Sequence, residues 1–183
     1  HPIALIFGLL SFVSYLVEGA VGDWSALYLF EDKGIVIEEA VMGVMLFNGT
    51  MCIGRLLGNR LGKHLTSKQV VVGGYLLGSI AMGLIVFLPG HASMYTYLLL
   101  GISLAMIVPN LFSAMGEQNV IPMTQAVATS TMLGYMGILM GPALIGFIAH
   151  GTSLTVAFIV LTTLLVVSAG IGKYAYHLMS KDC

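Results

Sequence analysis

The sequence contains little charge. Only 8% of its 183 residues are Asp, Glu, Lys or Arg, and 58% are hydrophobic, whereas an ordinary soluble domain carries about 25% charged residues. Its mean hydropathy is +0.99. This deficit excludes a typical water-soluble domain and indicates a membrane protein, for which we expect no nucleic-acid partner.

Cysteine and the common catalytic and ligand-binding motifs are also scarce or absent. Cys52 falls within an apolar run and Cys183 ends the chain, so the sequence provides no disulfide framework. The five histidines form no pair at helical ligand spacing, so we expect no metal and no cofactor. There is no phosphate-binding Gly-x-x-x-x-Gly-Lys-Ser/Thr loop, no Gly-x-Ser-x-Gly motif and no ring of charge. An ATP-driven pump, an enzyme and a channel are therefore not indicated.

Long apolar runs are what the sequence does contain. A helix needs about 20 apolar residues to cross the hydrocarbon core of a bilayer. The predicted spans are 3–29, 40–60, 69–88, 93–115, 124–149 and 153–177. We therefore predict an all-α membrane protein with a single six-helix bundle over residues 1–183. The short turn around Pro89 divides the bundle into three plus three helices, an arrangement typical of transporters built from repeats.

The distribution of the basic residues predicts the orientation of the bundle. If the chain starts inside, six of the seven Lys and Arg residues fall on the cytoplasmic side and only Lys33 falls outside. Cytoplasmic connectors carry the excess of Lys and Arg, so we expect both termini in the cytoplasm and an inner, cytoplasmic membrane location. Because the chain opens on His1-Pro2 without an initiating Met, we expect a fragment or a processed chain.

Small residues and prolines recur inside the predicted spans. Glycines stand at close-packing intervals, which predicts that they let helix backbones approach one another. They are Gly54, Gly58, Gly62, Gly74, Gly78, Gly137 and Gly141. Pro109 and Pro142 lie deep in the fourth and fifth spans, where each removes a backbone hydrogen bond and favours a kink.

Glu18 is the most informative polar residue inside a span. An ionised carboxylate there is costly unless it is paired, hydrated or protonated, and such residues are usually functional. Helical spacing places Tyr15 and Glu18 on one stripe with Gly22 and three serines, and we expect this stripe to face a cavity. Glu18 is then a proton-coupling site or a hydrogen-bonding partner for a polar substrate. The alternative is a structural carboxylate satisfied by a neighbouring helix or by a basic residue elsewhere in the protein.

Two asparagines are weaker site candidates. In the second span, Asn48 begins a polar line that continues through Cys52, Arg55 and Asn59. In the fourth span, Asn110 directly follows Pro109. For both asparagines, substrate contact and an interhelical hydrogen bond that only holds the bundle are equally good interpretations. A line in the fifth span that includes Tyr135 is weaker, and we interpret it as packing.

With these residues assembled, the chain resembles the C-terminal six-helix half of a major facilitator superfamily transporter over essentially its whole length. The main match is the segment Gly54-Arg-Leu-Leu-Gly-Asn-Arg-Leu-Gly-Lys-His64. Segments 18–25 and 133–146 are similar to the fucose-permease-like branch. In the superfamily, this loop is a charge-based gating latch. The resemblance assigns that role to Asn59, Arg60, Gly62 and Lys63, although Asn59 replaces the usual Asp and weakens the ionic part.

The resemblance implies secondary transport of a small solute by alternating access, with protons as the coupling ion. One six-helix bundle cannot enclose the path, so the partners implied are the lipid bilayer and either a missing N-terminal half or a second copy. The alternatives are a stand-alone six-helix carrier that works as a homodimer, and a multidrug-type exporter. The polar stripe suits a neutral hydroxylated solute, but the sequence identifies neither the cargo nor the direction of transport.

Overall fold

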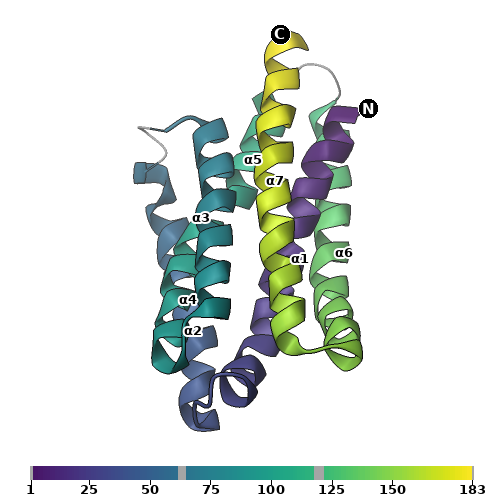
Figure 1. Cartoon of the computed structure of the whole chain (residues 1–183). Coiled ribbons are helices and arrows are strands. Elements are labelled where there is room, and N and C mark those ends of the chain that lie inside the picture. The colour runs from purple at the N-terminus through teal and green to yellow at the C-terminus, as the bar shows by residue number, and fades with distance from the viewer. Residues whose placement is uncertain (1, 62–64, 118–121, 183) are drawn as a thin grey trace.

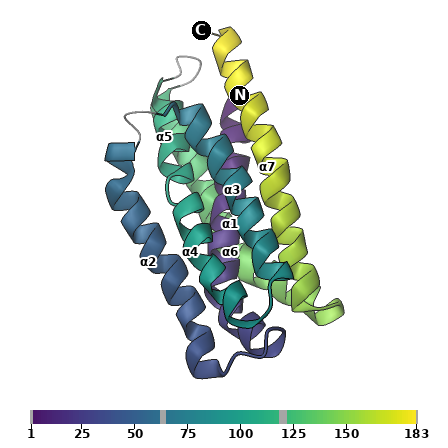
Figure 2. The same cartoon turned by 60° about the vertical axis from the view of Figure 1, so that its left-hand side comes forward.

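The fold is a bundle of helices in the computed structural model, which describes residues 2–61, 65–117 and 122–182. Figures 1 and 2 show the helices side by side, with both termini at the end of the bundle where α2 stops and α3 begins. We call this the termini end. The helices are α1 (Pro2–Glu31), α2 (Ile37–Leu61), α3 (Ser67–Phe87), α4 (Gly90–Leu104), α5 (Ile107–Glu117), α6 (Met123–Gly151) and α7 (Leu154–Asp182).

Within the described residues, six helical segments are long and apolar enough to cross a membrane. They are Ile3–Glu31, Ile37–Gly58, Ser67–Phe87, Gly90–Gly116, Met123–Gly151 and Leu154–Ser180. The prediction of an all-α fold with six spans is therefore confirmed, with ends displaced by a few residues. The second helix begins at Ile37 rather than at residue 40, because Glu38 and Glu39 in its first turn interact favourably with the free N–H groups there.

The fourth span is interrupted, and Pro109 explains where. A proline has no N–H to donate four residues back, and its ring crowds the carbonyl at that position, which is Ala105. The helix accordingly stops at Leu104 and restarts at Ile107. Asn110 satisfies the next carbonyl, because its backbone N and its side-chain Nδ2 donate to Met106 O at 3.2 and 2.8 Å. In contrast, α6 continues uninterrupted through Pro142.

The tightest packing in the bundle joins α1 to α6, and small residues make it possible. Gly137 lies against the backbone carbonyl of Phe12, and Gly141 lies against that of Leu16. A side chain at either glycine would meet backbone, which cannot move independently of its helix. Trp24 adds a hydrogen bond across the same seam, from Nε1 to Pro142 O at 2.9 Å. These backbones can approach closely only because glycine carries no side chain.

The other glycines predicted to pack also lie at helix contacts where the structure describes them. Gly54 and Gly58 of α2 face Ala105 and Met106, and Gly74 and Gly78 of α3 face residues of the fourth span. Gly62 lies outside the described residues. The fourth span is therefore held between α2 and α3.

A lysine connects the first connector to the end of α3. Lys33 Nζ donates to Val86 O at 2.6 Å and lies 5.3 Å from the centre of the Tyr28 ring. Partial burial lowers the pKa of the Lys33 ammonium below its ordinary value, although the neighbouring Asp32 carboxylate opposes the shift. The last carbonyls of a helix have no partner within the helix, so Lys33 stabilises this end of α3.

Candidate functional site

An ion pair joins the middle of α1 to α2. Arg55 Nη2 donates to Glu18 Oε1 at 2.8 Å. The Glu18 side chain is 12% exposed and that of Arg55 is 44% exposed, so the pair lies at an open face of the bundle rather than in its core. A carboxylate inside a membrane span requires such a partner, because desolvation otherwise destabilises its charge.

Two stacked tyrosines extend the site toward α6. Tyr15 lies one helical turn before Glu18, and its ring stacks on that of Tyr135 with centroids 6.3 Å apart and an interplanar angle of 7°. Tyr135 is 63% exposed and Tyr15 is half-buried. We call these four residues, Tyr15, Glu18, Arg55 and Tyr135, the Glu18 site.

Packing explains why these side chains meet. Gly134 of α6 leaves room for the Tyr15 ring, because an added Cβ there would lie 2.6 Å from Tyr15 Cδ2. The seam between α1 and α6 therefore fixes Tyr15 beside Tyr135. The contact between α1 and α2 brings Arg55 to Glu18. The site presents a carboxylate, a guanidinium and the faces of two phenol rings, which suits hydrogen bonding combined with stacking.

The polar stripe predicted for α1 is divided between two environments, which corrects the expectation that it faces one cavity. Ser11, Ser14 and Ser25 are buried, whereas Gly22 is exposed and Glu18 is near the surface. Ser14 Oγ lies 2.8 Å from the hydroxyl of Tyr75, which itself donates to Leu10 O at 2.7 Å. Helix α1 is packed on several sides, so part of the stripe binds Tyr75 of α3 inside the bundle.

Each of the two asparagines bonds to a backbone carbonyl four residues earlier in the chain. Asn48 is exposed on α2, and its Nδ2 donates to Val44 O at 3.0 Å. Asn110 is half-buried, and its amide supports the break beside Pro109. Among the described residues, the structure gives neither of them an interhelical hydrogen bond. Asn48 does stand two turns from Arg55 with exposed Cys52 between them, so these three share a face of α2.

The predicted gating latch falls mostly outside the described part of the chain. Gly62 and Lys63 are outside the described residues. Asn59 and Arg60 belong to the last turn of α2, but their side chains are not described. The latch remains a prediction.

Sequence reasoning missed Arg55 and Tyr135 as members of the site. Their signals were present, since Arg55 is a charge inside a span and Tyr135 belongs to a polar line on the fifth. The sequence places Arg55 in the polar line of α2, but that line alone does not pair it with a residue of another helix. A long arginine side chain bridges a difference in depth between two helices, because its charged end extends well away from its backbone.

Comparison with known proteins was made for the whole chain, and no family model matches it. It is 42% identical over 157 residues to an uncharacterized MFS-type transporter of Yersinia pestis, covering 84% of this chain and 40% of that protein. It is 30% identical over 170 residues to membrane protein MosC of Rhizobium meliloti, covering 91% of this chain and 42% of that protein. It is 28% identical over 159 residues to an uncharacterized transporter of Sinorhizobium fredii, covering 85% of this chain and 41% of that protein.

The extent of these matches agrees with the fold. The chain spans about two-fifths of the length of the curated relatives it matches. Together with six helices suited to cross a membrane, these relatives identify an integral membrane protein that is similar to MFS-type transporters and fits one half of such a transporter.

Proposed function

We propose that this chain is the C-terminal half of a major facilitator superfamily secondary transporter, which moves a small solute across the cytoplasmic membrane by alternating access. The single observation that carries the proposal is the Glu18–Arg55 pair, a partly exposed ion pair within the spans at an open face of the bundle. The half-length match to transporters supports the same proposal. The rest of the path would come from an N-terminal half, or from a second copy.

Proton coupling follows from the chemistry of the pair. When Glu18 is ionised, it holds Arg55 against α1. When Glu18 takes up a proton, the attraction between full charges is lost and Arg55 becomes available to another acceptor. Protonation thereby changes how α1 is joined to α2, and a solute that bonds to Arg55 would bind the protonated state preferentially. Differential binding of this kind is what couples a ligand to a conformational equilibrium.

The test uses the full-length protein in proteoliposomes. A screen for compounds that raise its melting temperature first identifies a solute, because binding to the native state stabilises it. We expect Glu18→Gln to lose uptake driven by a proton gradient and to retain counterflow exchange of that solute. Asp23→Asn is the matched control, because Asp23 is an exposed carboxylate farther along α1, and this variant should keep both activities.

Two results contradict the proposal in different ways. If Glu18→Gln keeps gradient-driven uptake at the wild-type rate, Glu18 is not the coupling site. If the wild-type protein catalyses neither uptake nor exchange of any stabilising solute, the transporter assignment itself fails.

A multidrug-type exporter is the second candidate, and the face of α6 favours it. Met132, Tyr135 and Leu139 follow helical spacing and are 68%, 63% and 77% exposed. Methionine and aromatic side chains adapt to varied apolar ligands. The stabilisation screen separates the candidates, because an exporter of this type would respond to lipophilic compounds and a solute carrier to polar ones.

A further inference from the structure

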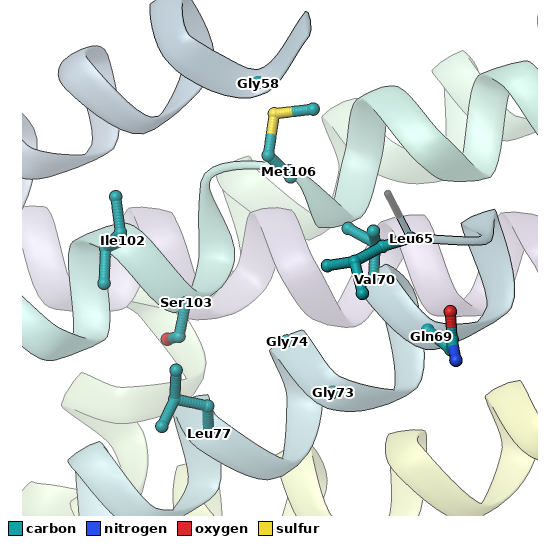
Figure 3. A pocket seen from close by; sticks show the side chains of 10 residues that line it. All are labelled: Gly58, Leu65, Gln69, Val70, Gly73, Gly74, Leu77, Ile102, Ser103 and Met106. Carbon is teal, nitrogen blue, oxygen red and sulfur yellow. The ribbon is translucent and has the colours of Figure 1, made fainter. Parts of the chain in front are cut away.

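An apolar groove lies between α2 and α3 and contains none of the four residues of the Glu18 site. Helices α2 and α3 each flank the fourth span but do not contact one another within the described residues, and a cavity of about 370 Å³ occupies the gap. Figure 3 shows Met106 beneath Gly58, and Ile102 and Ser103 of α4 opposite Leu77 of α3. Its volume falls within the ~300–1,000 Å³ typical of ligand pockets.

The walls of the groove present few polar groups among the side chains described, and most of these are bonded. Ser103 Oγ donates to Leu100 O at 2.7 Å. Gln69 lies at the rim, and its Oε1 accepts from Thr66 N at 2.9 Å as part of the cap of α3. Leucine, isoleucine, methionine and glycine form most of the remaining surface. The interior of the groove therefore favours a hydrocarbon occupant.

The segment of the chain that contains the lining residues carries basic side chains and no acidic ones. From Ala40 to Gly116 the chain contains no Asp or Glu, whereas it contains Arg55, Arg60, Lys63 and Lys68. Lys68 is exposed in the first turn of α3 and adjoins Gln69 at the rim. The groove thus opens beside the positive charge of Lys68 at the termini end of the bundle, whereas the carboxylates of α2, Glu38 and Glu39, lie in its first turn at the opposite end.

We propose that this groove binds an acyl chain of an anionic glycerophospholipid, whose phosphate group interacts with Lys68. The apolar walls match the chain, and Lys68 matches the phosphate. A zwitterionic lipid shares the chain but carries no net charge for Lys68 to attract. A positive residue near a membrane surface favours an anionic lipid by a factor of about five.

The groove can be filled without disturbing its walls. Gly73 of α3 lines it and is exposed, and a Cβ built there meets no atom within 4 Å. Gly73→Leu therefore places a side chain in the space of the acyl chain, and its Cβ meets no neighbour. Gly151→Leu is the matched control, because Gly151 is also free of neighbours within 4 Å but ends α6 at the opposite end of the bundle.

The experiment counts lipids retained by the purified full-length protein in native mass spectrometry after exchange with phosphatidylglycerol or phosphatidylcholine. We expect wild type and Gly151→Leu to retain phosphatidylglycerol, and Gly73→Leu to retain one molecule fewer. We expect Lys68→Gln to lose about fivefold in its preference for phosphatidylglycerol over phosphatidylcholine. Leu77→Trp fills the same groove from a residue that is 39% exposed and replaces Gly73→Leu if the latter lowers the melting temperature.

Three outcomes overturn the proposal. Equal retention of phosphatidylglycerol by wild type and both filled variants places the lipid elsewhere. Equal retention of both lipids by wild type removes the role of charge. A change in oligomeric state on filling the groove shows that a second copy, rather than a lipid, occupies it. None of these results bears on transport, which is measured separately.

Discussion

At the scale of single residues, the Glu18–Arg55 pair is held by two charges that differ in exposure. Most of the Glu18 side chain is covered by the protein, whereas nearly half of the Arg55 side-chain surface is exposed. An arginine in this position can bond to another acceptor at its open side, but the carboxylate has few alternatives. The two partners therefore differ in how readily each finds another bond, and removing Arg55 should affect the stability of the protein differently from removing Glu18.

Removal of the arginine alone should destabilise the protein. Arg55→Gln leaves the Glu18 carboxylate without its partner, and we expect a loss of about 1–2 kcal/mol, below the cost for a fully buried pair because Arg55 is partly exposed. Adding Glu18→Gln should recover most of that loss. Thermal unfolding of the two variants in detergent measures this, and a double variant less stable than Arg55→Gln would show that the carboxylate has another partner.

At the scale of elements, the seam between α1 and α6 depends on two glycines. Gly137→Ala and Gly141→Ala each place a methyl group against a backbone carbonyl of α1. The helices must then separate, and overpacking of this kind costs about 1–3 kcal/mol. We expect both variants to melt below the wild-type temperature.

The control for this prediction is Gly170→Ala in α7. Gly170 is exposed with no neighbour within 4 Å of an added Cβ, so alanine should leave the stability unchanged or raise it through its helix propensity. If Gly137→Ala melts at or above the wild-type temperature while Gly170→Ala does the same, the seam tolerates separation and the packing argument is wrong.

Sequence patterns predicted the elements better than the contacts between them. Apolar runs located the six spans because hydrophobic length is a property of each segment alone. The site required knowledge of which helices are neighbours and how deep each one sits, and the sequence does not show that Arg55 of α2 meets Glu18 of α1. The break beside Pro109 lay within reach of the sequence, since a proline affects a defined carbonyl, but the role of Asn110 in supporting that break depended on its rotamer.

At the scale of the whole molecule, the exposed face of α2 that carries Arg55 borders either a water-filled path or lipid, and the reactivity of a thiol on that face separates the two. Cys52 is exposed on the same face as Arg55. A thiol reacts as the thiolate, which forms in water and not in hydrocarbon. If that face borders the transport path, Cys52 should react with a water-soluble maleimide in full-length protein that has no other cysteine.

The matched control for this labelling is Ile80→Cys in the same protein with Cys52 replaced by Ser. Ile80 is 57% exposed on α3, which we expect to face lipid, so this thiol should stay unlabelled. A solute from the stabilisation screen should slow the labelling of Cys52. Equal labelling at both positions would show that exposure alone, rather than a path, governs the reaction.

The three-plus-three repeat and the orientation of the termini remain predictions.

The interruption of the fourth span also has a mechanical consequence. Helix α5 has eleven residues, so at 1.5 Å per residue it extends about 16 Å from the break at Ala105 and Met106. A tilt of about 10° at this joint moves its far end by about 3 Å. That displacement is about as large as a hydrogen bond is long, and helices α1, α3 and α6, which contact α5, would have to accommodate it.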